Sequence, residues 1–124
     1  MAIQLSVSAR NARLDAIETT AGTSAKLRIY SGSAPADCAT AASGTLLVDI
    51  ALPSDWMSAA SSGSKAKLGT WQGTAAATGT AGYFRIVDNA GTTCHVQGTV
   101  TATGGGGDLT LDNVSIASSQ TVTI

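Results

Sequence analysis

The sequence has few of the residues on which catalysis, metal binding and large hydrophobic cores depend. It contains one histidine, two cysteines, two prolines and a single phenylalanine, and only 12% of its residues are charged. Seven scattered lysines and arginines, in a chain of net charge -1, cannot form the concentrated basic face that nucleic-acid binding requires. No run approaches the roughly 18 apolar residues of a membrane-spanning helix. We therefore expect neither nucleic acid nor a membrane as a partner.

Small residues make up most of the chain instead. Ala, Thr, Ser and Gly account for 67 of the 124 residues, whereas Leu, Ile, Val and Phe supply only 24. The hydrophobic content of 44% includes 22 alanines, which bury little area. The core is therefore expected to be thin and to gain stability from contacts with neighbouring molecules. The mean hydropathy of +0.20 argues against a disordered chain.

The N-terminus and the cysteines bear on where the protein is made. Residues 1–7 lack the basic and apolar segments of a signal peptide, so we expect synthesis in the cytoplasm without standard secretion. Cys38 and Cys94 are too few for a disulfide scaffold and lack metal-ligand spacing. Both lie among small or apolar residues, so we expect buried free thiols, the alternative being a contact or bond between them.

Hydrophobic spacing divides the chain into an arm, a helix and a β core. Apolar residues alternate in residues 1–8, which predicts an extended arm. Residues 9–21 repeat apolar side chains every three or four positions, which predicts a short helix with Ser8 as its N-cap and Gly22 just beyond its end. From residue 25 to residue 124 the period is two, as in strands.

Turn residues separate the predicted strands of the β core. The clearest signal is a hairpin in which residues 83–87 and 93–100 flank the turn at 88–91. Residues 74–82 are predicted to form a loop, and the four glycines at 104–107 a flexible hairpin tip.

The strand pattern predicts both the fold class and the side chains that face the core. Leu27 and Ile29 are expected to point inward and Tyr30 outward. The predicted fold is mainly β, a small β-sandwich or jelly-roll-like barrel of about seven short strands, with an extended N-terminal arm and one short helix. It forms a single domain over residues 1–124.

The few chemically active side chains do not form a recognisable catalytic or metal site. Cys94 and His95 are adjacent on a strand, so their side chains point to opposite faces and cannot form a dyad. His95 is expected to face solvent or an interface. Asp108 and Asp112 lack the ligand density of a calcium loop and are expected to be turn residues. We therefore expect no enzyme, with no catalytic, cofactor-binding or metal-binding residues and no small-molecule substrate.

Two tryptophans, Trp56 and Trp71, are the largest side chains of the sequence. In a chain with so little bulk, both are expected to fill the core or a subunit interface. The alternative is an exposed pair that stacks on sugars.

Five segments together resemble small structural proteins of tailed bacteriophages and prophages. They are SARNARLDAIE at 8–18, KLRIY at 26–30, LPSDW at 52–56, GYFRIV at 82–87 and DLTLDN at 108–113. They span most of the chain and contain no catalytic motif.

The resemblance implies a capsid cement or decoration protein. Such proteins bind the shell of the major capsid protein on the outer surface of the virion, commonly as trimers, and stabilise the head against the pressure of packaged DNA. The arm would then contact a neighbour by strand addition, and the helix would supply further contacts. The candidate interface residues are Ile3, Leu5, Val7, Arg10, Arg13, Leu14, Ile17 and Trp56.

Two other interpretations compete with the capsid role. The chain could belong to a head fibre, tail or baseplate, with a carbohydrate-binding face. It could also be an enzyme, which the single histidine and the dispersed acids disfavour.

Overall fold

The computed structural model describes residues 2–124. The chain is mainly β, as predicted, with 37% of residues in strands and 12% in one helix. The elements are α1 (Val7–Ala21), β1 (Lys26–Ser31), β2 (Leu46–Ala51), β3 (Gln72–Thr74), β4 (Gly79–Val87), β5 (Cys94–Ala102), β6 (Leu109–Leu111), β7 (Ser115–Ile116) and β8 (Thr121–Thr123).

Helix α1 begins at Val7, two residues earlier than predicted. Its N-cap is Ser6, whose hydroxyl accepts a hydrogen bond from the Ala9 amide at 3.1 Å, so the prediction of Ser8 as the cap was wrong. At the other end Gly22 has a φ of 86°, and its amide donates to a carbonyl of the last helical turn at 2.9 Å. The predicted glycine terminus is therefore confirmed, and Val7 belongs to the helix instead of the arm.

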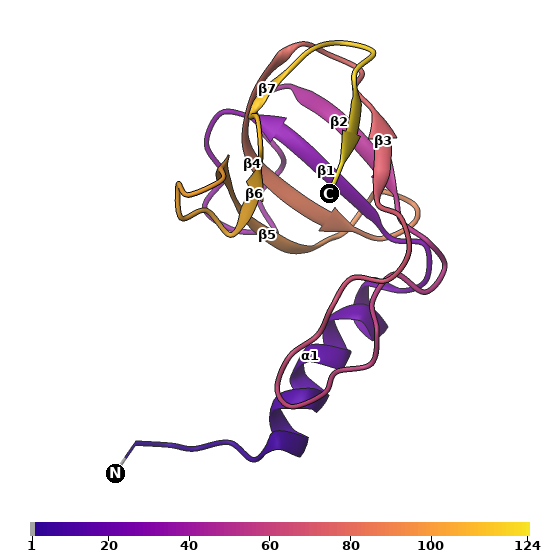
Figure 1. The fold of residues 1–124 in the computed structure, drawn as a ribbon, viewed down its shortest axis with the longest axis vertical. Coiled ribbons are helices and arrows are strands. Elements are labelled where there is room, and N and C mark those ends of the chain that lie inside the picture. The colour runs from indigo at the N-terminus through magenta and orange to yellow at the C-terminus, as the bar shows by residue number, and fades with distance from the viewer. Residues whose placement is uncertain (1) are drawn as a thin grey trace.

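Six strands form one mixed sheet in the order β2-β1-β4-β5-β6, with β7 paired to the start of β4. Strands β3 and β8 form a second sheet, which a bridge between Val48 and Ala75 joins to β2. The strands curl around a shared interior, and α1 projects from one end of them (Figure 1). We call the strands and connections outside residues 2–22 and 54–69 the β body.

The predicted hairpin is confirmed, because β4 and β5 pair antiparallel on either side of residues 88–91. Two predicted loops differ from expectation. Residue 74 ends β3 and residues 79–82 begin β4, so the predicted loop at 74–82 is shortened to residues 75–78. Strands β5 and β6 pair in parallel, so the glycines at 104–107 do not form a hairpin tip. They turn the chain back over Thr101, where a Cβ on Gly105 or Gly107 would lie only 2.8 Å from the threonine side chain.

Both tryptophans lie in the core. Trp56 is fully buried and its ring centroid lies 5.9 Å from that of Trp71. The Trp56 indole N–H donates to the Gly22 carbonyl at 3.0 Å, which joins the end of α1 to the core. Trp56 therefore has no surface to offer a partner, and its prediction as an interface residue was wrong.

Tyr30 is buried, contrary to the predicted outward orientation. Its ring stacks on that of Tyr83, with centroids 5.0 Å apart. The Tyr83 hydroxyl in turn donates to the Ser43 carbonyl at 2.6 Å. The pair is thus covered by the long connection between β1 and β2.

A disulfide joins Cys38 in this connection to Cys94 at the start of β5. The expectation of free thiols was wrong, and the alternative of a bond between them is correct. The buried Arg85 guanidinium also donates to two carbonyls of the connection, at 3.2 and 2.7 Å. A covalent bond and several hydrogen bonds therefore fix the connection to the sheet.

Replacing both cysteines with alanine is expected to lower the free energy of unfolding by about 2–4 kcal/mol, because the bond closes a long loop in the unfolded chain. Urea denaturation measures the difference. A reducing agent should destabilise the wild type by a similar amount and leave the double variant unchanged. Equal stabilities of the two proteins would contradict the prediction.

Candidate functional site

A stalk projects from the β body and consists of α1 and the hairpin formed by residues 56–68 (Figure 1). The hairpin is closed by bridges between Met57 and Lys67 and between Ser61 and Ser64. Its two central turn residues, Ser62 and Gly63, both have positive φ angles of 52° and 74°. Positive φ at both positions matches the twist of a two-residue hairpin turn.

Three polar side chains on one face of α1 hold the hairpin against the helix. The amides of Gly63 and Ala60 donate to the Asn11 and Asp15 side chains at 2.8 and 2.9 Å. The Met57 amide donates to the Glu18 carboxylate at 3.0 Å. The acceptors are spaced by four and three residues, so they lie on one helical face, and the donors recur every three residues.

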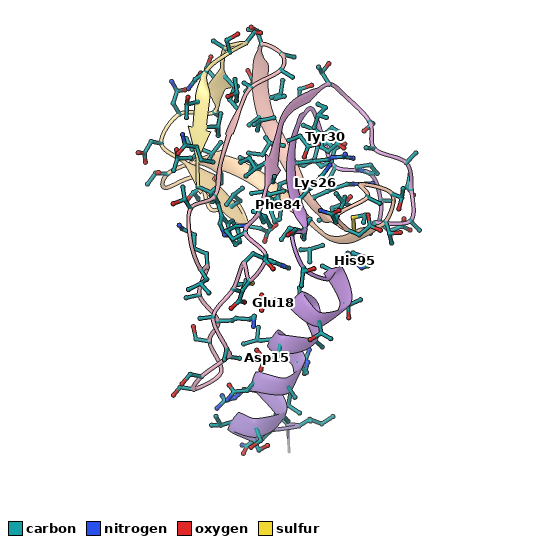
Figure 2. The ribbon with its side chains drawn as sticks, turned by 90° about the vertical axis from the view of Figure 1, so that its right-hand side faces the viewer. Asp15, Glu18, Lys26, Tyr30, Phe84 and His95 are labelled. Carbon is teal, nitrogen blue, oxygen red and sulfur yellow. A yellow bond between two sulfur atoms is a disulfide. The ribbon has the colours of Figure 1, made fainter. Side chains whose placement is uncertain are left out.

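Lys65 completes this attachment. Its ammonium lies 2.7 Å from the Asp15 carboxylate and 2.9 Å from that of Glu18, and its side chain is only 4% exposed. Figure 2 shows both carboxylates on the side of α1 that faces the hairpin. We call Asn11, Asp15, Glu18 and Lys65 the polar clip. It attaches the helix to the hairpin through charge and hydrogen bonds.

The clip shifts the pKa values of its members. The Lys65 hydrogen bond and the Ala60 amide lower the pKa of Asp15. Burial acts to raise the pKa of Glu18, but the bonds from Lys65 and the Met57 amide outweigh it and the pKa is lowered. Burial acts to lower the pKa of Lys65, but its two carboxylate partners raise it overall. All three groups are therefore held in their charged forms.

The predicted interface residues other than Trp56 lie on the arm and on α1, where all but the half-buried Leu14 are exposed. The exposed fractions are 94% for Ile3, 41% for Leu5, 47% for Val7 and 40% for Ile17. Among residues 2–124, the only other large hydrophobic side chain so exposed is Leu68, at the base of the hairpin. The exposed apolar surface is thus concentrated on the stalk and its arm.

Two arginines accompany this apolar surface. Arg10 and Arg13 are exposed, Leu14 between them is half-buried, and no salt bridge within residues 2–124 involves either arginine. The acidic residues of the same helix are neutralised in part by Lys65. The exposed surface formed by Arg10, Arg13 and Ile17, which we call the outer face of α1, is therefore apolar and cationic.

The remaining candidates have structural contacts. Cys94 is in the disulfide, and His95 is half-buried beside Ala16 and Thr20 of α1, at the joint between stalk and β body (Figure 2). Asp108 accepts hydrogen bonds from the Thr99 amide and hydroxyl at 2.9 and 3.0 Å. Within residues 2–124, no group of three or more His, Cys, Asp or Glu side chains could hold a metal ion.

A hollow of about 620 Å³ lies between α1, the hairpin and the short segments that join them to the β body. Its charged lining includes Asp15, Glu18 and Lys65. Asp15, Glu18 and Lys65 already bond to one another or to backbone amides, whereas Asp55 also lines the hollow.

Sequence reasoning missed the polar clip. The spacing of polar residues at 11, 15 and 18 on one helical face was a usable signal, as was Ser-Gly at the tip of a serine-rich segment. Nothing in the sequence alone pairs those residues with Lys65, which lies 50 residues from Asp15.

Comparison with family models, with curated proteins and with solved structures finds no match to this chain. Among residues 2–124, α1 is the sole helix, and it is neither long nor apolar enough to cross a membrane.

Replacing Lys65 with methionine is expected to destabilise the stalk by about 1–2 kcal/mol, between the values typical of exposed and buried ion pairs. Hydrogen exchange at the amides of Met57, Ala60 and Gly63 should become faster, while exchange in β4 and β5 stays unchanged. Lys67→Met is the matched control, because that ammonium contacts only the Gly69 carbonyl, at 3.4 Å. Equal exchange rates in the two variants would contradict a role for Lys65.

The clip is also expected to weaken in acid. Because the pKa values of Asp15 and Glu18 are lowered in the folded state, their contribution is complete near neutral pH and is lost as the pH falls below about 4. The raised pKa of Lys65 keeps its contribution until the pH exceeds about 10. The stability difference between wild type and Lys65→Met, measured by urea denaturation, should therefore shrink in acid. A difference independent of pH would refute this account.

Proposed function

We propose that this protein is a bacteriophage capsid cement or decoration protein. In this role it binds the major capsid protein on the outer surface of the virion, as a homotrimer, and stabilises the head against the pressure of packaged DNA. The observation that carries the proposal is the concentration of exposed apolar side chains on the arm and the outer face of α1. The resemblance of five sequence segments to phage structural proteins is the reason for proposing the major capsid protein as the partner.

The arm is suited to docking on a shell. Residues 2–6 precede the helix without pairing to any strand, and Ile3 and Leu5 alternate with smaller or polar residues. An extended segment of this pattern can add to the edge of a neighbouring sheet, which satisfies its backbone groups and buries alternate side chains. Full burial of each large apolar side chain contributes up to about 1.5–3 kcal/mol.

The rest of the molecule suits a structural protein that is present in many copies on a virion surface. The β body is held by a disulfide and by the buried Arg85. Both tryptophans are buried, so they provide no exposed aromatic pair for stacking on sugars. The alternative of a fibre, tail or baseplate module with a carbohydrate-binding face therefore loses its candidate residues.

Deleting residues 2–5 is expected to abolish binding to expanded capsids, because it removes Ile3 and Leu5 while leaving the Ser6 cap in place. Co-sedimentation with shells lacking the protein measures binding, and the temperature of DNA release measures stabilisation. Gln4→Ala is the control and should bind like the wild type.

Failure of the full chain to bind shells would refute the proposed function. Equal binding by the deletion variant would refute the role given to the arm.

A further inference from the structure

Arg85 is a buried cation with no carboxylate beside it. The residue is 5% exposed, and no salt bridge within residues 2–124 involves its guanidinium group. The buried ammonium of Lys65, in contrast, lies between two carboxylates. Removing a charge from water is costly unless an opposite charge or enough hydrogen bonds replace the solvent. The burial of Arg85 therefore favours an anion at this position.

Arg28 lies directly opposite Arg85 on the neighbouring strand. The two residues, which we call the arginine pair, are partners in the register of β1 with β4, so their side chains lie on the same face of the sheet. Like charges in this arrangement are destabilising. Asp49 of β2 is the register partner of Arg28 on its other side and accepts a hydrogen bond from its Nε at 3.2 Å. This carboxylate offsets one of the two positive charges and leaves the other.

Both members of the arginine pair keep N–H groups that no acceptor uses. Arg85 donates from Nε to the Gln97 side chain and from Nη2 to two carbonyls of the connection between β1 and β2. Arg28 donates from Nε to Asp49 and from Nη1 to the Gly91 carbonyl, both at 3.2 Å. Within residues 2–124, Nη1 of Arg85 and Nη2 of Arg28 have no hydrogen-bond acceptor, and neither nitrogen is sealed from solvent. Each guanidinium therefore has donors left for a ligand.

Two further carboxylates, in the adjoining loops, bond within their own turns. The Asp37 carboxylate accepts hydrogen bonds from the Thr40 amide and hydroxyl at 2.8 and 2.9 Å. The Asp88 carboxylate accepts one from the Thr92 amide at 2.8 Å. Neither acid forms a salt bridge with the arginine pair. Both acids thus stabilise turns and leave the unused guanidinium N–H groups to another acceptor.

A hollow of about 200 Å³ lies between the sheet face that carries the arginine pair, the β1–β2 connection and the turn between β4 and β5. Its lining includes both arginines, Tyr30, Thr40 and Thr92. Both cysteines of the disulfide also line it, so one wall is covalently fixed, and Figure 2 shows the disulfide on the same side of the β body as Tyr30. The volume is too small for a drug-sized molecule and sufficient for a small ion.

We propose that this hollow binds a small oxyanion, of the phosphate or sulfate type, between Arg28 and Arg85. Guanidinium groups bind such anions through charge-assisted hydrogen bonds, and two guanidinium groups on neighbouring strands can contact different oxygens of one tetrahedral anion. The bound anion offsets the positive charge that Asp49 leaves. The site lies away from the arm and the stalk and does not depend on the proposed role at the capsid.

Titration calorimetry with inorganic phosphate, at constant ionic strength, tests the site in the full chain. The wild type should bind a single phosphate ion. Arg28→Gln should weaken this binding about tenfold or more, because it removes a charge-assisted hydrogen bond. Lys26→Gln is the matched control, because it removes the same charge from the same face of β1, outside the lining of the hollow. A wild type that does not bind phosphate, or two variants that bind it equally, would overturn the proposal.

Amide chemical shifts locate the bound ion independently of these variants. Phosphate should shift the amides of Thr40, Gly91 and Thr92, which belong to the lining of the hollow, more than those of Arg10 and Arg13 on α1. The largest shifts on α1 would assign the binding to the stalk and overturn the proposal.

Asp49→Asn separates anion binding from a purely structural role of the arginine pair. This change removes the carboxylate that competes for Arg28, so phosphate should bind several-fold more tightly than to the wild type. Weaker or unchanged binding would contradict an anion held by Arg28.

Discussion

The arrangement of the stalk depends on one ion-pair cluster, in which the Lys65 ammonium lies between the carboxylates of Asp15 and Glu18. Charge and backbone hydrogen bonds join the hairpin to the helix at three positions along α1. Because both acids face the hairpin, Arg13 and Ile17 remain exposed elsewhere on the helix. The clip thus determines which face of the helix is available to other molecules.

The β body is stabilised differently from the stalk. Its interior contains a stacked tyrosine pair, a tilted tryptophan pair and a cluster of aliphatic side chains. Trp56 belongs to both parts, because its ring lies in the core while its N–H bonds to the end of α1. The junction between stalk and body is therefore apolar inside and hydrogen-bonded at its edge.

Local patterns predicted the local parts of this fold. The mainly β class, the β4–β5 hairpin and the glycine end of the helix follow from period-two alternation and turn chemistry in neighbouring residues. Features that join distant residues did not follow, such as the bond between Cys38 and Cys94 and the parallel pairing of β5 with β6. For the candidate site, the apolar arm and helix were predictable from residue spacing. The burial of Trp56 and the contacts of Lys65 were not, because they depend on residues that are distant in the sequence and meet only in the folded chain.

The length of α1 sets a fixed distance within the molecule. Fifteen residues at about 1.5 Å each separate the arm from the β body by about 22 Å. The hairpin runs beside the helix over much of this distance and braces it (Figure 1). The stalk therefore sets the distance between the arm and the β body, so a molecule that bound the arm would lie about one helix length from the β body.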